Sequence, residues 1–254
     1  MTLHFHSGYA YQEVLESEVD QTPTILIHGA GSSHLGWPSA IRHLSGKHIL
    51  SIDLPNHGKS AQKELQSIEQ YADNLHSFLN GLGIQHANLI GHSMGAALVL
   101  QLILQYPELC VRGALFAYTP APVFKELFSE AGDHDKNQPE WIQTFTERLF
   151  SPGFPIAQRE KISSPLFFKD SETLRSDLLI TQQYQPALPV GKISIPFLLL
   201  YGEDDPFLNQ SQKQILIKKF INPVVKEIPR AGHLFLWEHT EIVQKYLVEF
   251  LDNA

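Results

Sequence analysis

The stretch Leu89-Ile90-Gly91-His92-Ser93-Met94-Gly95 contains the pattern that decides the fold of this chain. An apolar run typical of a buried strand leads into Gly-x-Ser-x-Gly, and an apolar segment typical of a helix follows. This order predicts a sharp strand-to-helix turn that exposes the Ser93 hydroxyl at the top of a sheet. Glycine suits both flanking positions because so tight a turn leaves no room for Cβ atoms. Gly-x-Ser-x-Gly also arises by chance, so its meaning depends on whether the chain supplies a base, an acid and an oxyanion hole.

Continuous apolar runs alternate with helical patterns along most of the chain. The runs expected to be strands are Thr24–Ile27, His48–Ile52, Ala87–Ile90, Gly113–Ala117, Ile195–Tyr201 and Val224–Ile228. Helices are expected around Pro38–Leu44, Ile68–Leu82, Met94–Gln105, Gln210–Phe220 and Glu241–Leu251. This alternation predicts an α/β fold whose mostly parallel, twisted sheet carries helices on both faces. The Met94–Gln105 helix is apolar nearly all round and should be buried, and Leu3–His6 with Tyr9 onward should form an antiparallel hairpin.

One segment interrupts the alternation. Between about Pro120 and Val190 no parallel strand is evident, and aromatic residues alternate with prolines and charges. These aromatics are Phe124, Phe128, Trp141, Phe145, Phe150, Phe154, Phe167, Phe168 and Tyr184. We expect residues 120–190 to form an inserted helical lid, or cap, over a core made of residues 1–119 and 191–254. The alternative is a set of helices that simply pack on the core.

A serine hydroxyl becomes a strong nucleophile only when a base takes its proton, and the base needs an acid to hold its tautomer. When the serine sits on such a turn, the acid and the histidine follow it in that chain order. An acidic turn, Gly202-Glu203-Asp204-Asp205-Pro206, follows one predicted strand, and Gly232-His233 follows the next. The Gly-x-x-Asp spacing favours Asp205 as the acid and leaves Asp204 as the alternative, with Glu203 behind both. Ser93, Asp205 and His233 are therefore the predicted catalytic residues.

An oxyanion hole needs two backbone N–H groups aimed at the developing negative charge. Met94, the residue after the serine, supplies one, and the loop His28-Gly29-Ala30-Gly31 supplies the other, from Ala30. The same glycine-rich loop could suggest phosphate binding. It lacks both the lysine of a P-loop and the three-glycine spacing of dinucleotide sites.

Together these motifs resemble the α/β-hydrolase superfamily over essentially the whole chain. The further match is Asp53-Leu54-Pro55-Asn56-His57-Gly58-Lys59-Ser60. Members of that family usually have glycine where Asn56 and often where Ala96 stand here; asparagine tolerates a left-handed backbone and alanine is small. A nucleophilic aspartate at position 93 would have suggested a haloalkane dehalogenase or an epoxide hydrolase, and Ser93 argues against both.

The resemblance implies a serine hydrolase that cleaves a carboxylic ester through an acyl-enzyme, and the aromatic lid suggests an apolar acyl or aryl group. A second possibility uses the same three residues on a carbon–carbon bond, as in ring-cleavage-product hydrolases and small lyases of quinone biosynthesis. Those enzymes take acidic substrates and usually have an arginine near the cap, for which Arg148, Arg159 and Arg175 are available. A third is a ligand sensor that keeps the three residues but turns over slowly.

Composition excludes several other classes. The net charge is −8 and no basic block stands out, which argues against nucleic acid or an anionic membrane surface as the main partner. The single cysteine, Cys110, permits no intramolecular disulfide and is expected to be a small buried thiol. His4 and His6 share a predicted strand face but have no third ligand at a suitable spacing, so no metal or other cofactor is expected. We expect a cytoplasmic monomer or homodimer without a membrane span, acting on a small-molecule ester or related carbonyl compound.

Overall fold

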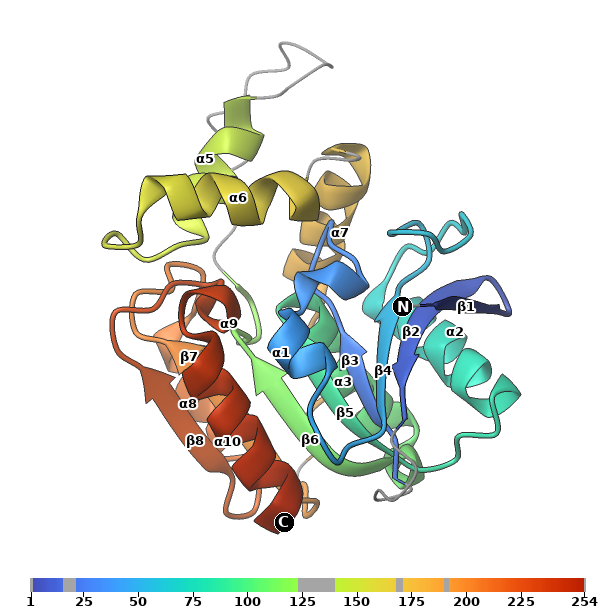
Figure 1. Cartoon of the computed structure of the whole chain (residues 1–254). Coiled ribbons are helices and arrows are strands. Elements are labelled where there is room, and N and C mark those ends of the chain that lie inside the picture. Colours follow the sequence, from blue (N-terminus) through green and yellow to red (C-terminus); the bar gives the residue numbers. More distant parts are fainter. Residues whose placement is uncertain (1, 16–21, 123–139, 168–170, 190–191, 254) are drawn as a thin grey trace.

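The computed structural model describes residues 2–15, 22–122, 140–167, 171–189 and 192–253. Within them, eight strands form one sheet in the order β1-β2-β4-β3-β5-β6-β7-β8 (Figure 1). The strands are β1 (Leu3–His6), β2 (Tyr9–Val14), β3 (Thr24–Ile27), β4 (Ile49–Asp53), β5 (Ala87–His92), β6 (Cys110–Phe116), β7 (Phe197–Gly202) and β8 (Val224–Ile228). β1 and β2 form the expected hairpin, β2 pairs antiparallel with β4, and the remaining neighbours are parallel. The predicted mostly parallel α/β sheet is confirmed.

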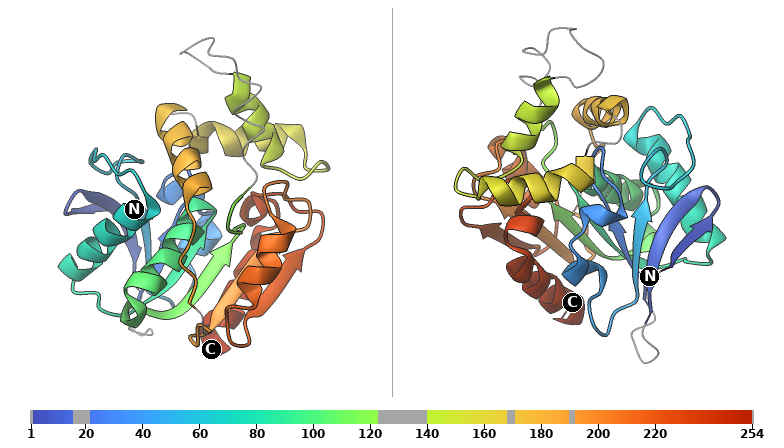
Figure 2. Two further views of the ribbon diagram at one scale, coloured as in Figure 1. Left: turned by 180° about the vertical axis from the view of Figure 1, so that it is seen from behind. Right: turned by 45° about the horizontal axis from the view of Figure 1, so that its top comes forward.

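Helices cover both faces of this sheet (Figure 2). They are α1 (Ser39–Arg42), α2 (Ile68–Gly81), α3 (Met94–Gln105), α8 (Gln210–Ile217), α9 (Phe235–Glu238) and α10 (Thr240–Asn253), with short 3₁₀ turns η1 (His34–Gly36) and η2 (Pro107–Leu109). Alternate strand residues enter two separate apolar cores, because side chains along a strand point to opposite faces. Ile25 and Ile27 pack with α2 and α3, whereas Leu26 packs with α1 and α10.

Helix α3 is the buried central helix that its sequence predicts. Its residues Met94 to Leu100 are fully buried, and it starts directly at the end of β5. The α8 helix is shorter than expected because the chain leaves the helix before Phe220. The centroid of the Phe220 ring lies 4.1 Å from that of the Phe197 ring, and Phe220 pairs with Ile193 in an isolated β-bridge.

In the described residues between β6 and β7, three further helices are present: α5 (Glu140–Arg148), α6 (Ile156–Phe167) and α7 (Ser171–Gln183). They gather beyond one end of the sheet, at the top of Figure 1. α7 is attached to the central helix, since the Tyr184 hydroxyl just past its end donates to Gln101 Oε1 at 2.7 Å. Phe124, Phe128 and Phe168, which we expected in this region, lie outside the described residues. None of the helices in the described ranges is long and apolar enough to cross a membrane.

Candidate active site

The turn between β5 and α3 holds Ser93 in a backbone conformation that few residues adopt. Its φ is 54° and its ψ −117°, and its N–H donates to Phe116 O on the neighbouring strand at 2.9 Å. A Cβ atom on Gly91 would lie 2.2 Å from Gly95 O, and one on Gly95 would lie 2.3 Å from Ile27 O. Both glycines are therefore required by close backbone approach, and the strain at Ser93 is held by the elements around it.

Three predicted residues meet in one hydrogen-bonded line. Asp205 Oδ2 accepts from His233 Nδ1 at 2.8 Å, and His233 Nε2 lies 2.9 Å from Ser93 Oγ. All three are buried, and the second carboxylate oxygen of Asp205 accepts the Phe207 N–H at 3.0 Å. With the Nδ1 proton fixed by the carboxylate, a neutral His233 ring presents the lone pair of Nε2 to the serine hydroxyl.

The two other acids of the same turn are placed differently. Asp204 and Glu203 are both exposed, and Glu203 accepts the Arg230 N–H at 3.2 Å. Of the three acids in this turn, Asp205 is the one that hydrogen-bonds to His233, and it is also the one at the Gly-x-x-Asp spacing.

Two side chains that the sequence did not single out hold the backbone around His233. His92, on the elbow itself, donates from Nε2 to the His233 carbonyl at 2.9 Å. Burial, followed by the nearby His233, lowers the pKa of His92 to about 3, so it acts as a neutral donor. Glu238 Oε1 accepts the N–H groups of Gly232 and Ser151, both at 3.0 Å. The loop that carries His233 is thereby fixed from both sides.

The two predicted oxyanion donors flank Ser93. Met94 is the first residue of α3, where backbone N–H groups have no intrahelical partner, and Ala30 lines the same cavity as Ser93. Among the described residues, neither N–H donates to a protein acceptor. The start of α3 also carries the positive end of the helix dipole, which favours an anion there.

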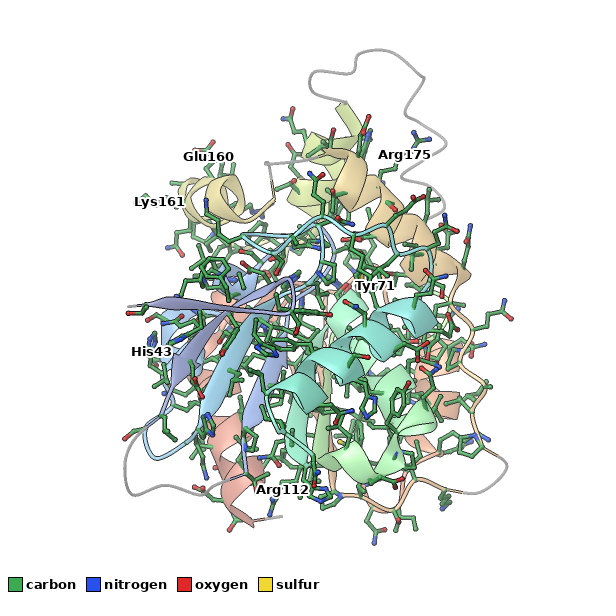
Figure 3. The ribbon with its side chains drawn as sticks, turned by 90° about the vertical axis from the view of Figure 1, so that its right-hand side faces the viewer. His43, Tyr71, Arg112, Glu160, Lys161 and Arg175 are labelled. Carbon is green, nitrogen blue, oxygen red and sulfur yellow. The ribbon has the colours of Figure 1, made fainter. Side chains whose placement is uncertain are left out.

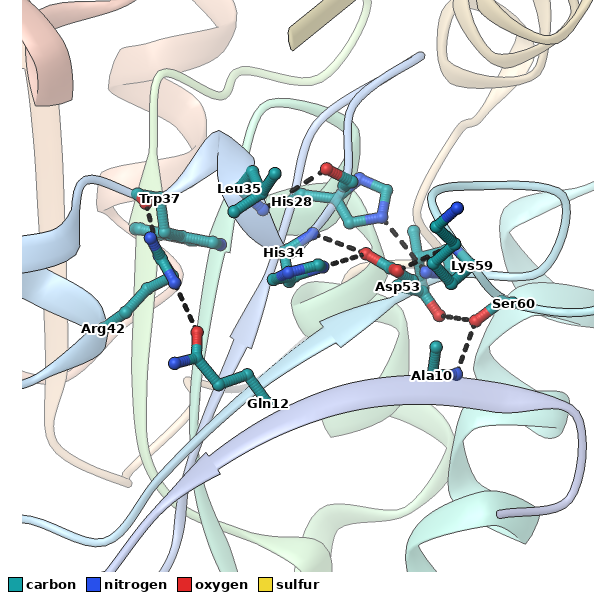
Figure 4. A network of polar contacts seen from close by, with 12 residues as sticks. Ala10, Gln12, His28, His34, Leu35, Trp37, Arg42, Asp53, Lys59 and Ser60 are labelled. Atoms are coloured by element: carbon teal, nitrogen blue, oxygen red, sulfur yellow. Dashed lines mark hydrogen bonds and ion pairs between the residues drawn. The ribbon is translucent and has the colours of Figure 1, made fainter. Parts of the chain in front are cut away.

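The loops below this site are held by Asp53, at the end of β4 (Figure 4). Asp53 Oδ1 accepts from the His34 backbone N–H at 2.6 Å and lies 2.8 Å from the His34 ring, and Oδ2 accepts the Lys59 N–H at 2.8 Å. Burial alone would raise the pKa of Asp53, but the bonds from His34 hold it below its usual range. His28 donates from Nδ1 to Gly29 O and accepts the Leu54 N–H at Nε2. Burial lowers the pKa of His28 to about 4, which keeps the ring neutral.

A small cavity adjoins Ser93. Its volume is about 20 Å³, which is room for about one water molecule. Its lining residues are His28, Gly29, Ala30, Ser32, Gly36, Trp37, His92, Ser93, Phe145, Leu149, His233 and Leu234. No lysine or arginine is among these described lining residues. A larger cavity of about 360 Å³ lies at the opposite, amino ends of β7 and β8, far from the serine.

The three arginines that the sequence offers between β6 and β7 do not line this cavity. The Arg159 guanidinium donates to the carbonyls of Phe154, Ser151 and Pro152, which ties it into its own loop. Arg175 is exposed on the outer face of α7 (Figure 3). Arg148 is half-buried at the end of α5 and does not line the cavity.

A cysteine and a histidine that could in principle react or bind a metal make structural contacts instead. The Cys110 thiol is buried as predicted, and burial raises its pKa to about 12. The His4 ring stacks on Tyr11 at 5.4 Å. Within the described part of the chain, no group of three or more histidine, cysteine or acidic side chains is placed to hold a metal ion.

Comparison with known proteins shows which family the chain matches and which proteins and structures it is similar to. The model of the alpha/beta hydrolase family matches residues 24–245. The 2-hydroxy-6-oxononadienedioate/2-hydroxy-6-oxononatrienedioate hydrolase of Comamonas testosteroni is 25% identical over 91% of this chain and 87% of its own length. The 2-hydroxy-6-oxo-6-phenylhexa-2,4-dienoate hydrolase of Burkholderia cepacia is 25% identical with the same coverage. The structure of a thermophilic esterase from Thermogutta terrifontis shares the fold, with a TM-score of 0.81 at 20% identity, covering 96% of this chain and 93% of its own.

Proposed function

The chain belongs to the alpha/beta hydrolase family, and we propose that it is a serine esterase that cleaves a carboxylic ester of an uncharged, apolar acyl or aryl group. Ser93, His233 and Asp205 form the catalytic triad, and the N–H groups of Ala30 and Met94 form the oxyanion hole. The observation that carries this proposal is the line from Asp205 through His233 to Ser93 Oγ, with contacts of 2.8 and 2.9 Å.

The reaction follows from the proton positions in that line. Ser93 Oγ attacks the acyl carbon while His233 Nε2 takes its proton, and Asp205 stabilises the resulting imidazolium. The negative oxygen of the tetrahedral intermediate accepts the two N–H groups of the oxyanion hole. His233 then protonates the leaving alcohol. A water molecule, deprotonated by His233, then attacks the acyl carbon; the bond to Ser93 Oγ breaks, Oγ takes the proton back from His233, and the acid is released.

The cavity wall supports an uncharged substrate. Its histidines His28 and His92 have pKa values lowered to about 4 and about 3, so both are neutral near pH 7. No lysine or arginine among the described lining residues is placed to form an ion pair with a substrate carboxylate, so burying that charge would be costly.

We also propose that residues 120–190 act as a cap on a core of residues 1–119 and 191–254. Phe145 and Leu149, from this segment, line the cavity beside Ser93. The Phe145 ring lies 5.6 Å from the Phe207 ring, which in turn meets the His233 ring edge-on at 5.2 Å. The cap would therefore exclude water from the reacting groups and limit the size of the acyl group.

Carbon–carbon bond hydrolysis is the second candidate, because the curated relatives named above are hydrolases of that kind. Their substrates, as named, are carboxylic acids, and the described cavity wall offers such an acid no lysine or arginine. The two candidates therefore differ in the charge of the substrate they should accept.

The test compares both substrate classes on one preparation. We expect a fluorophosphonate probe to label the wild type and not the Ser93→Ala variant. We expect short p-nitrophenyl esters to have a kcat/KM at least about tenfold above that of a 2-hydroxy-6-oxo-dienoate. The reverse ranking would assign the carbon–carbon reaction, and labelling that persists in Ser93→Ala would refute Ser93 as the nucleophile. A single burst of p-nitrophenol without turnover would indicate a sensor.

A further inference from the structure

We propose that Asp177, on α7, is a positioning residue for the oxyanion hole, and that its partner His57 makes this positioning depend on pH. The inference rests on the proposed function of Ser93. Asp177 Oδ2 accepts the Gly31 N–H at 2.8 Å and lies 2.7 Å from His57 Nε2. Both side chains of the Asp177–His57 pair are 1% exposed. The three elements joined here lie far apart in sequence: α7, the loop after β3, and the loop after β4.

The contact falls one peptide bond from the proposed oxyanion donor. Gly31 N is bonded to the carbonyl carbon of Ala30, so fixing the Gly31 N–H fixes the peptide plane that follows Ala30. The same turn is closed on its other side by Ser32 N–H, which donates to Gly29 O at 3.3 Å. Both bonds restrict the rotation that would turn the Ala30 N–H away from the reacting carbonyl.

Helix α7 also meets this loop through its packing. Gly31 has a φ of +63°, and a Cβ atom on it would lie 2.8 Å from Leu174 Cδ1, one turn before Asp177 on α7. The loop and the helix are therefore in direct contact, with no space for a side chain between them. A shift of α7 would displace the loop that carries Ala30.

The hydrogen bonds of His57 define its charge. Nδ1 lies 2.8 Å from the Pro55 carbonyl oxygen and Nε2 lies 2.7 Å from the Asp177 carboxylate. Both partners only accept, so both ring nitrogens carry protons and His57 is an imidazolium. Burial opposes this charge, but the attraction and hydrogen bond of Asp177 and the bond to Pro55 O outweigh it and raise the pKa of His57.

Other titratable groups surround this pair. The His28 ring, from the loop after β3, lies 4.9 Å from the His57 ring and is neutral because burial lowers its pKa. Asp53, at the end of β4, adds attraction for the imidazolium. Tyr71 lies where α2 approaches α7 (Figure 3), and its hydroxyl bonds to Asp177. Burial and the Asp177 charge raise the pKa of Tyr71, so the phenol stays protonated.

Loss of the His57 proton therefore changes the site. A neutral ring must give up one of its two donated bonds, and the Asp177 carboxylate loses its compensating charge in a buried position. Without the charge and full hydrogen bonding of His57, the Asp177 carboxylate is no longer held in the position where it accepts the Gly31 N–H, and the loop can shift. Below the pKa of His57 the arrangement is complete, and it is lost as the pH rises through that value.

The first test uses Asp177→Asn, which keeps the shape of the side chain and removes its charge, with the exposed neighbour change Ser176→Ala as control. Removal of an oxyanion donor costs about 10²–10³ in rate, so a displaced donor should lower kcat by about 10- to 100-fold. KM for a p-nitrophenyl ester should change less than about twofold, because the oxyanion forms only after binding. An equal loss in Ser176→Ala, or a loss confined to KM, would overturn the inference.

The rate of fluorophosphonate labelling separates this inference from the proposed function. Attack on phosphorus also places negative charge in the oxyanion hole, whatever the natural substrate is. A wild type that is not labelled contradicts the proposed function. A labelled wild type whose rate equals that of Asp177→Asn contradicts the positioning role alone.

The second test uses His57→Gln, which retains a donor toward Asp177 without a titrating proton, and it decides the matter if Asp177→Asn does not fold. We expect the labelling rate of the wild type to fall as the pH rises through the pKa of His57, and that of His57→Gln to show no such fall. The same falling limb in both proteins, or none in the wild type, would overturn the proposed role of His57.

Discussion

Replacement of Asp205 by asparagine should abolish almost all activity by reversing the tautomer of His233. One carboxylate oxygen of Asp205 accepts the Phe207 N–H at 3.0 Å, and the other accepts from His233 Nδ1 at 2.8 Å. In Asp205→Asn the amide oxygen is required by the Phe207 N–H, so the amide NH₂ faces His233 Nδ1. That nitrogen must then accept, and the ring proton moves to Nε2, where it faces Ser93 Oγ. His233 can no longer take the serine proton.

The expected loss in kcat is about 10⁴-fold, the size of effect found when a triad histidine is held in the wrong tautomer. This corresponds to about 5 kcal/mol of transition-state stabilisation. The assay is steady-state hydrolysis of p-nitrophenyl acetate, with circular dichroism to show that the variant is folded. Asp204→Asn is the matched control, because Asp204 is exposed and its N–H bond to Ala231 O at 2.9 Å does not involve the side chain. A variant at 205 that keeps a tenth of wild-type kcat, or an equal loss at 204, would refute this reasoning.

Three further predictions concern the cavity, the buried histidines and the turn. Phe145→Ala should shift the preferred p-nitrophenyl ester to longer acyl chains by enlarging the cavity, measured as kcat/KM along an acetate-to-octanoate series; an unchanged profile would contradict the cap's role. The free energy of unfolding in urea should fall as the pH drops below about 6.5, by up to about 1.4 kcal/mol per pH unit. The reason is that His92 has a pKa of about 3 in the folded protein and is protonated there only at much lower pH than in the unfolded chain. His92→Gln should reduce that slope, and an unchanged slope would exclude His92 as a source. Gly91→Ala should destabilise the fold by about 3 kcal/mol through overpacking, whereas Gly153→Ala, with nothing within 4 Å of a new Cβ, should leave the melting temperature unchanged.

Much of the core fold follows from local pattern. Thr24–Ile27, Val224–Ile228 and Met94–Gln105 have the predicted bounds, because each run is flanked by residues that end it. Elsewhere the ends move by a few residues where tertiary contacts decide. Asn56 adopts the left-handed conformation (φ 69°) that the comparison with family members implies.

The candidate site could be predicted only as far as it lies next to strand ends. Ser93, Asp205 and His233 each follow a parallel strand, so the order of the strands brings them together. Asp177 lies inside a helix, 146 residues from its partner Gly31, and no pattern in either segment relates the two. His92 occupies a position that the Gly-x-Ser-x-Gly pattern leaves free, although it fixes the His233 carbonyl.

The buried histidines illustrate why the sequence could go no further. The sequence does not distinguish the thirteen histidines from one another, but those around the site differ in the hydrogen-bond partners of their two ring nitrogens. His28 and His92 are buried and lack a carboxylate partner, so burial keeps them neutral and they serve as fixed hydrogen-bonding groups. His57 meets the Asp177 carboxylate and a carbonyl, which favour its protonated form and raise its pKa. His233 meets one carboxylate and one hydroxyl, the combination that leaves a single lone pair aimed at the Ser93 hydroxyl. The charge and the role of each ring thus depend on the hydrogen-bond partners of its two nitrogens, and at least one of these partners comes from a distant segment of the chain.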